Sequence, residues 1–300
     1  MVLRIVLVYN ILTMKPILKW VGGKTQILDK VLDNFPSTID NYYEPFIGGG
    51  SVLLGLLSSD NILVTGNIYA NDSNPALINM YKNIQSDPEG LYNKIEELSK
   101  IINGLPDVKG VTKPSNEDAL QSRESYYYWM RSKYNKLEDK SSLESSSMFI
   151  FLNKTCFRGL HREGPNGFNV PWGNYKNPII ASKSHLMEIH NLIRNVIFTN
   201  FDWSGSIANV CEGDFVYLDP PYVPVDEKSF VAYTKAGFVK HDELFERIKG
   251  LSCKWLMSNS SSEIVSNAFT NNRIIYITCK RSINSKNPES TCQEVLVPSH

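Results

Sequence analysis

The chain has 300 residues and a hydrophobic content of 42%, which fits one large packed domain or two modest ones. Lys plus Arg and Asp plus Glu both total 31, so the net charge alone indicates no class of partner. The charge is unevenly distributed, because residues 123–183 hold ten basic and five acidic side chains. This region suits a lobe that faces a polyanion, although a solvated basic surface explains the charge equally well.

The five cysteines are scattered and lack metal-ligand spacing, so the sequence predicts neither a metal site nor a disulfide framework. A reducing compartment fits this pattern, and we expect a cytoplasmic protein. Residues 1–13 are apolar but too short to span a bilayer, and no small-residue cleavage site follows them. We interpret them as an appendage or alternative start before a folded domain that begins at Met14, in preference to a signal peptide. No membrane association is expected.

Helix and strand patterns alternate in the first part of the chain, in the order helix 25–34, strand into 43–44, helix 51–58, strand 67–71 and helix 75–84. Residues 86–147 are polar and helix-forming, with a Gly/Pro-rich loop at 103–114 and a serine-rich connector predicted at 141–147. Turn signals after Phe149 predict a hairpin or an extended loop on this helical insert. Alternation then resumes, with strands predicted at 195–201, 215–218, 254–257 and 273–279.

These patterns predict an α/β fold. A β–α–β order with glycine at a strand-to-helix junction is typical of a doubly wound, Rossmann-like sheet. The helical insert with its β-hairpin interrupts that sheet.

The tetrapeptide Asp219-Pro220-Pro221-Tyr222 follows the predicted strand 215–218. An exocyclic amino group of a nucleobase is a poor nucleophile, because its lone pair is delocalised into the ring. The amino group is drawn toward tetrahedral geometry when its two N–H groups donate hydrogen bonds to a carboxylate and to a neighbouring backbone carbonyl. Two prolines stiffen such a loop and remove donors. Tyr222 offers a face for an extruded base, where stacking returns about 1–3 kcal/mol. A structural turn at a strand end is the alternative.

A glycine turn, EPFIGGG at 44–50, lies between a strand and a helix and permits close approach of the backbone to a ligand. It matches neither GxGxxG nor a Walker loop, which disfavours nucleoside triphosphate binding. Asp72 ends the next strand, where a doubly wound fold places an acid against ribose hydroxyls; a helix N-cap from Asp72, Ser73 or Asn74 is the alternative. In LKWVGGK, Trp20 and Lys24 could hold an aromatic ring and a carboxylate, or be a core Trp and a solvated Lys.

Six motifs occur in the order LKWVGGK, EPFIGGGSV, NDSNPALINMY, FLNKTCFRGLHREGPNGFNVPWGNYKNP, GDFVYLDPPY and RSINSK. Over about residues 15–296 they resemble the Dam-type DNA adenine-N6 methyltransferases of the alpha group. The resemblance implies a site-specific enzyme that transfers a methyl group from S-adenosyl-L-methionine to N6 of a flipped-out adenine in duplex DNA. Transfer would be a direct displacement without a covalent enzyme intermediate, and the chain lacks the Pro-Cys motif of cytosine-C5 enzymes.

The resemblance also implies residue roles. The catalytic residues would be Asp219, Pro220 and Tyr222. The cofactor residues would be Trp20, Lys24, Glu44, Phe46, Gly48, Gly50, Asp72, Phe201, Asp202 and Asp219. The DNA-binding residues would be Lys19, Arg158, Leu160, Arg162 and Tyr175. Arginine can read guanine bidentately, at about 1–3 kcal/mol of discrimination per contact. GATC-methylating enzymes often carry Asn at the position of Arg158, so we assign no recognition sequence, and a phosphate contact by Arg158 is an equal alternative.

The predicted organisation is a discontinuous catalytic domain at 14–76 and 186–298 and a DNA recognition domain at 77–185. We expect a monomer, with a dimer on DNA as the alternative. A cytosine-N4 methyltransferase would use the same chemistry, usually with Ser in place of Asp219. A catalytically silent DNA-binding relative, or an enzyme acting on RNA or a protein amide, is a further alternative.

Overall fold

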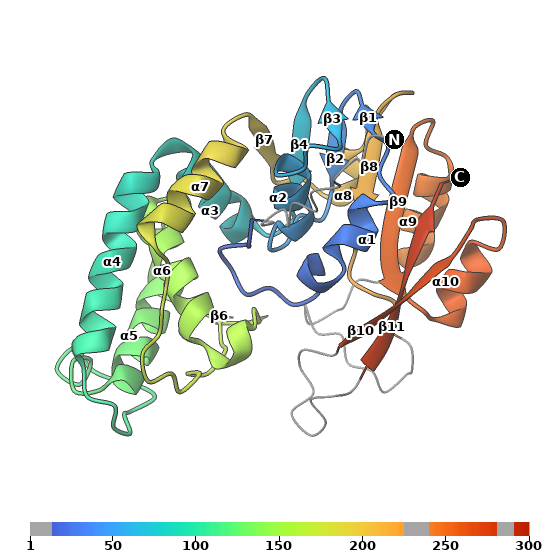
Figure 1. Cartoon of the computed structure of the whole chain (residues 1–300). Coiled ribbons are helices and arrows are strands. Elements are labelled where there is room, and N and C mark those ends of the chain that lie inside the picture. Colours follow the sequence, from blue (N-terminus) through green and yellow to red (C-terminus); the bar gives the residue numbers. More distant parts are fainter. Residues whose placement is uncertain (1–13, 225–239, 281–290, 300) are drawn as a thin grey trace, which may run out of the picture.

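The computed structural model describes residues 14–224, 240–280 and 291–299 (Figure 1). Its centre is a seven-stranded sheet with the order β10-β11-β9-β8-β2-β4-β7. Strands β9, β8, β2, β4 and β7 are parallel, and β11 runs antiparallel between β9 and β10. The predicted α/β fold with a mostly parallel sheet is therefore confirmed. The strands are β2 (Tyr42–Glu44), β4 (Ile68–Asn71), β7 (Val196–Thr199), β8 (Phe215–Leu218), β9 (Lys254–Ser260), β10 (Ile275–Lys280) and β11 (Thr291–Pro298).

Strand β8 lies near the middle of the sheet and is buried along its whole length. Its side chains alternate between two hydrophobic clusters, with Phe215 and Tyr217 in one and Val216 and Leu218 in the other. A continuous apolar run of this kind is typical of a parallel strand covered on both faces. This explains why the sequence predicted the strand with the correct bounds.

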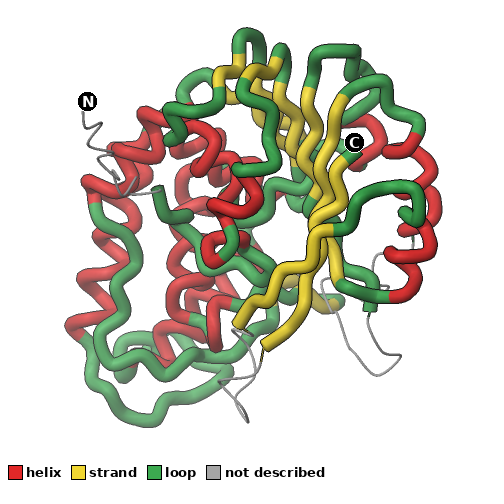
Figure 2. The backbone as a smooth tube through the Cα atoms, turned by 45° about the vertical axis from the view of Figure 1, so that its right-hand side comes forward, coloured by secondary structure: helices red, strands yellow, loops and turns green. Residues whose placement is uncertain are grey.

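Helices cover both faces of the sheet, as the tube view in Figure 2 shows. One hydrophobic cluster joins β8 to the helices α1 (Leu28–Leu32), α2 (Ser51–Leu57), α3 (Pro75–Ser86) and α7 (Lys183–Ile193). The other cluster joins it to α8 (Trp203–Ser206), α9 (His241–Lys249) and α10 (Glu263–Ala268). The 3-10 helix η1 (Lys24–Gln26) precedes α1, and the short strands β1 (Thr38–Ile39) and β3 (Leu63–Val64) pair with each other.

The remaining helices gather at one side of the molecule, beyond the β7 edge of the sheet (Figure 1). They are α4 (Pro88–Gly104), α5 (Arg123–Lys136) and α6 (Leu143–Thr155), followed by the 3-10 helix η2 (Phe157–Gly159) and the hairpin β5 (Glu163–Gly164) and β6 (Gly167–Phe168). Helix α6 is central to this group, because it contacts α3, α4 and α5. None of the helices in the described residues is long and apolar enough to cross a membrane.

One sequence prediction in this region is wrong. The expected connector at 141–147 is largely the start of α6, where Ser145, Ser146 and Ser147 are buried and Ser142 is the N-cap. Serine favours caps and turns in isolation, but its small side chain also permits close helix packing, and the Ser146 hydroxyl accepts a bond from Asn83 of α3 (2.8 Å). The hairpin or extended loop predicted after Phe149 is confirmed by the β5–β6 hairpin at 163–168, which the 3-10 turn at 157–159 precedes.

Gly50, the N-cap of α2, gives a test of the packing around the glycine turn. Its φ of 74° is left-handed, and a Cβ there would overlap the Tyr81 hydroxyl. We expect Gly50→Ala to lower the free energy of unfolding by at least about 1–2 kcal/mol, the cost of left-handed backbone for an L residue. Gly104→Ala in α4 is the matched control, since nothing lies within 4 Å of its added Cβ. Urea denaturation would contradict the prediction if both variants were equally stable.

Candidate functional site

A cleft of about 1310 Å³ opens at the carboxyl ends of the parallel strands β2, β4 and β8. In open α/β sheets, ligands bind at this edge, where the connections from adjacent strands diverge. The cleft is lined by most of the predicted cofactor residues and by all the predicted catalytic ones, namely Trp20, Lys24, Glu44, Phe46, Gly48, Asp72, Asp202, Asp219, Pro220 and Tyr222. Gly50 and Phe201 are not among its lining residues, so their proposed contact with a cofactor stays a prediction.

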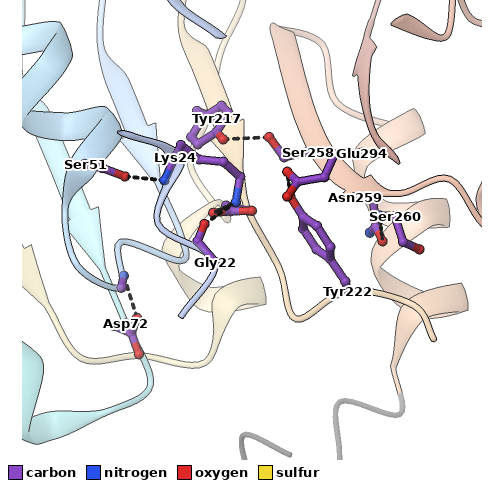
Figure 3. Close-up of polar contacts among 12 residues, drawn as sticks. Gly22, Lys24, Ser51, Asp72, Tyr217, Tyr222, Ser258, Asn259, Ser260 and Glu294 are labelled. Carbon is purple, nitrogen blue, oxygen red and sulfur yellow. Dashed lines mark hydrogen bonds and ion pairs between the residues drawn. The ribbon is translucent and has the colours of Figure 1, made fainter. Parts of the chain in front are cut away.

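An ion pair joins the start of η1 to the turn after β8 (Figure 3). The Lys24 ammonium lies 2.7 Å from Asp219 Oδ2, with side chains that are 2% and 19% exposed. The same ammonium donates to the carbonyl of Gly22, and the Lys24 backbone N–H donates to the Ser51 hydroxyl (2.9 Å). The alternative of a solvated lysine at position 24 is therefore wrong. Burial raises the pKa of Asp219 to about 6, although Lys24 opposes the shift.

The turn that carries Asp219 and Tyr222 is fixed from two neighbouring strands. The Tyr222 hydroxyl donates to Glu294 Oε2 on β11 (2.7 Å). At the end of β9, Asn259 Oδ1 accepts from the Val223 N–H (3.0 Å) and the Ser260 hydroxyl donates to the Val223 carbonyl (2.6 Å). None of these three supporting residues, Glu294, Asn259 and Ser260, was predicted from the sequence. Their contacts with the turn arise only when β11 pairs with β9, and this long-range pairing has no local signal in the sequence.

Glu44 lies at the carboxyl end of β2 and is buried. The Tyr42 hydroxyl donates to Glu44 Oε2 (2.8 Å). Burial raises the pKa of Glu44 to about 8, so this side chain is mostly protonated at neutral pH. The Glu44 carboxyl therefore lines the cleft chiefly as a neutral group.

Asp72 connects the glycine turn to the start of α3. Its carboxylate accepts from the Gly48 N–H (3.0 Å) and from the Asn74 N–H (2.9 Å). Burial raises the pKa of Asp72, and the two N–H bonds oppose that shift. The N-cap of α3 is Asn74, whose side chain accepts from the Ala76 N–H, so the N-cap alternative for Asp72 is wrong.

Trp20 packs between the glycine turn and the helical part of the chain. A Cβ on Gly48 would lie 2.9 Å from Trp20 Cδ1, and one on Gly49 would lie 2.8 Å from Trp20 Cβ. On its other side the Trp20 ring stacks with His161, at 5.2 Å between centroids. His161 Nε2 also lies 3.2 Å from Asn74 Nδ2. The segment after η2 thus reaches into the cleft through His161, a contact that no sequence signal indicated.

Asp202 and Phe201 follow β7. The exposed Asp202 side chain caps α8 by accepting from the Ser204 N–H (3.1 Å) and hydroxyl (2.8 Å), and it lines the cleft. Phe201 is 57% exposed, and its N–H donates to Asn71 Oδ1 (2.8 Å). The Phe201 backbone therefore fixes the loop, while its ring lies at the surface.

The predicted DNA-binding residues lie outside the lining of the cleft. Lys19 Nζ donates to the Tyr175 hydroxyl (3.0 Å), and the Lys19 side chain packs against Gly159. Asn153 of α6 connects these segments, because its amide bonds to the Lys19 N–H (2.9 Å), the Lys19 carbonyl (2.8 Å) and the Gly159 carbonyl (3.1 Å). The structure thus brings Lys19, Tyr175 and the segment around Gly159 together.

Three further predicted DNA-binding residues lie on this same segment. Arg158 is exposed, with a φ of 58°, and its guanidinium lies 5.1 Å from the Phe157 ring centroid. Arg162 is exposed and donates through Nε to Asn169 Oδ1 (2.6 Å). Leu160 is half-buried and packs against the hydrophobic core.

Comparison with known proteins places this site in a family. The family model of D12 class N6 adenine-specific DNA methyltransferases matches residues 20–283. The Type II methyltransferase M.MjaIII of Methanocaldococcus jannaschii is 34% identical, over 91% of this chain and 93% of its own length. The Type II methyltransferase M1.LlaDCHI of Lactococcus lactis subsp. cremoris is 30% identical over 97% of each chain. The DNA adenine methylase of Escherichia coli K12 is 28% identical, over 89% of this chain and 88% of its own length.

Removing the Lys24 ammonium should destabilise the fold in a pH-dependent way. Breaking a buried ion pair from one side costs about 3–5 kcal/mol, because the other charge stays buried. In Lys24→Met the pKa of Asp219 rises further above its value of about 6. A carboxyl whose pKa is higher in the folded than in the unfolded state lowers the free energy of unfolding when the pH is above the folded pKa. Protonation removes this destabilisation as the pH falls.

The stability deficit of Lys24→Met should therefore be largest near pH 8 and shrink as the pH falls toward 6. Urea denaturation across this range measures it. The exposed Lys30→Met on α1 is the control, and we expect little change in that variant. A deficit for Lys24→Met that does not depend on pH would contradict the assignment of the pair.

Proposed function

The chain belongs to the D12 class N6 adenine-specific DNA methyltransferases, and we propose that it draws the target adenine from duplex DNA into the cleft beside Asp219, with S-adenosyl-L-methionine as methyl donor. The observation that carries this proposal is the half-buried, ion-paired Asp219 carboxylate on a proline-stiffened turn, in one cleft with the glycine turn and Asp72. An acceptor held rigidly at the reacting atom needs no rearrangement during the reaction.

In this proposal Asp219 and the adjacent backbone carbonyl accept hydrogen bonds from the two N–H groups of the adenine amino group. The nitrogen lone pair would then attack the methyl carbon that the donor supplies when bound, with the donor's sulfur departing as a neutral thioether. The proton that the amino group loses would pass to solvent. Pro220 stiffens the turn, and Tyr222 supplies the ring on which the extruded base stacks. The ionised form of Asp219 is the stronger acceptor for the amino group, because a protonated carboxyl carries an O–H donor and keeps only part of its acceptor capacity. With a pKa of about 6, Asp219 is ionised at neutral pH.

The lining of the cleft fits a cationic sulfonium donor. Acidic side chains outnumber basic ones there, which favours a positively charged ligand. The Trp203 indole N–H is buried without an acceptor among the described residues, so an acceptor atom of the donor would satisfy it. We assign Asp72 to the ribose hydroxyls and Asp202 to the adenine amino group of the donor. Trp20, Lys24, Phe46 and the glycine turn would border the rest of it, with Glu44 at the base of the cleft. When bound, the donor supplies an electrophilic methyl group.

We assign the DNA contacts to residues 77–185 as an inserted recognition domain, with residues 14–76 and 186–298 as the catalytic domain. The basic charge of 123–183 and the exposed Arg158 and Arg162 support this division. Lys19 and Tyr175 lie against the same segment, and we assign them to DNA as well. Arginines there would read base edges or hold phosphates. We propose that one monomer acts on each site.

A biological role in restriction–modification is also proposed. It rests on the names of the relatives, because two Type II methyltransferases are 34% and 30% identical to the chain, whereas the Escherichia coli K12 DNA adenine methylase is 28% identical.

Expression in a host without DNA methylation tests the choice of base and of target sequence together. We expect long-read sequencing to find N6-methyladenine within a single recurring motif of the host genome. Finding only N4-methylcytosine, or no modified base while the folded protein is present, would overturn the proposal.

Asp219→Ala tests the acceptor role. We expect the single-turnover rate to fall at least about 100-fold, the usual effect of removing one preorganised hydrogen-bonding group. Affinity for DNA should change little, because Asp219 lies in the cleft away from the proposed DNA contacts. Asp60→Ala, at an exposed aspartate, is the control.

The pH dependence of the wild-type rate gives a second test of the same role. Below the Asp219 pKa of about 6 the rate should fall, by about tenfold per pH unit for a single group. Retained activity in Asp219→Ala, or a rate that stays flat between pH 7 and 5, would contradict the acceptor role.

A further inference from the structure

Glu294 connects the antiparallel end of the sheet to the catalytic turn. It lies on β11, lines the cleft, and accepts the Tyr222 hydroxyl at 2.7 Å (Figure 3). Its register partner on β9 is Ser260, whose hydroxyl holds the Val223 carbonyl. Adjacent strands thus hold adjacent residues of the same turn.

This arrangement fixes the Tyr222 ring at both ends. Pro220 and Pro221 restrict the backbone at one end, and the Glu294 carboxylate holds the hydroxyl at the other. A hydrogen bond to a charged acceptor is about twice as strong as a neutral one. The ring is therefore oriented before a base arrives, and less conformational freedom is lost when the base stacks on it.

Glu294 also acts on Asp219 through its charge. Burial is the main cause of the raised Asp219 pKa, the Lys24 ammonium opposes it, and the negative charge of Glu294 adds to it. The titratable groups of the described residues that act on Asp219 come from four elements and from the turn after β8. They are Lys24 of η1, Glu44 of β2, Tyr217 of β8, Tyr222 of the turn and Glu294 of β11. Loss of the Glu294 charge would therefore lower the pKa of Asp219.

We propose that Glu294 is a positioning residue for methyl transfer, which holds the Tyr222 ring in the orientation that receives the target base. This inference rests on the proposed roles of Asp219 and Tyr222. Glu294 acts through Tyr222 and not on the substrate, so its effect should appear in the methyl-transfer step and in base extrusion, with DNA affinity unchanged.

Four variants separate the hydrogen bond from the charge. Tyr222→Phe removes the hydroxyl and keeps the ring, Glu294→Ala removes the acceptor and the charge, and the double variant removes both partners. Glu294→Gln keeps an acceptor oxygen without the charge. Gln293→Ala is the matched control, because its exposed side chain is the neighbour of Glu294 on β11 and points to the opposite face. Circular dichroism and thermal unfolding establish that each variant is folded.

We expect Tyr222→Phe and Glu294→Ala each to lower the single-turnover rate roughly tenfold, as for a lost hydrogen bond to a charged group. The double variant should be no slower than the slower single variant, because both remove one contact. The fluorescence of 2-aminopurine at the target position, which reports base extrusion, should fall in all three. Glu294→Gln should retain the rate near pH 8 but shift the acidic limb of its pH profile to lower pH. Gln293→Ala should match wild type.

The proposal would be overturned if the fold-reduction in the rate of the double variant equalled the product of the two single fold-reductions. An acidic limb that does not move in Glu294→Gln would also overturn it. Failure of the proposed function is recognised separately, because Asp219→Ala would then remain active whatever the Glu294 variants do.

Discussion

The buried ion pair between Lys24 and Asp219 is the contact on which the site depends. An ammonium and a carboxylate removed from water are tolerated only as partners, since either one alone would cost several kcal/mol. The pair therefore fixes the start of η1 against the turn after β8, although the two are far apart in sequence. Tyr222 on that turn is in turn held by β11, so the constraint extends across the sheet to its antiparallel end.

The short segment that ends in Lys24 contacts several distant parts of the molecule. Trp20, four residues before Lys24, packs on the glycine turn and stacks with His161. Lys19 is held by Asn153 of α6 and donates to Tyr175. Residues 19–24 thus contact the catalytic turn, the glycine turn and the helical part of the chain.

Local pattern was enough to predict the parts of the fold that local chemistry determines. Strand β8 is an uninterrupted apolar run, and the glycine turn needs a left-handed residue at Gly50, so both were predicted from sequence. The role of Glu294 could not be predicted, because it arises from β11 pairing between β9 and β10, a long-range event without a local signal. The prediction of a connector at 141–147 was wrong for a related reason. Packing of α6 against α3 and α5 overrides the preference of its first serines for turns. Asp72 was placed correctly in the cleft, but only the structure distinguishes it from the N-cap Asn74.

Three carboxyl groups lie at or directly after the carboxyl ends of neighbouring strands and face one cleft, yet they do not ionise alike. Burial raises the pKa of Glu44 to about 8 and that of Asp219 to about 6, and it also raises the pKa of Asp72. At neutral pH Glu44 is therefore mostly neutral and Asp219 is charged. The difference has a structural cause: the Lys24 ammonium contacts Asp219, whereas Glu44 accepts a hydrogen bond from the neutral Tyr42 hydroxyl. The contact with Lys24 thus keeps Asp219 ionised at neutral pH, whereas Glu44 is mostly protonated. The ionised carboxylate is the one that lies on the same turn as Tyr222.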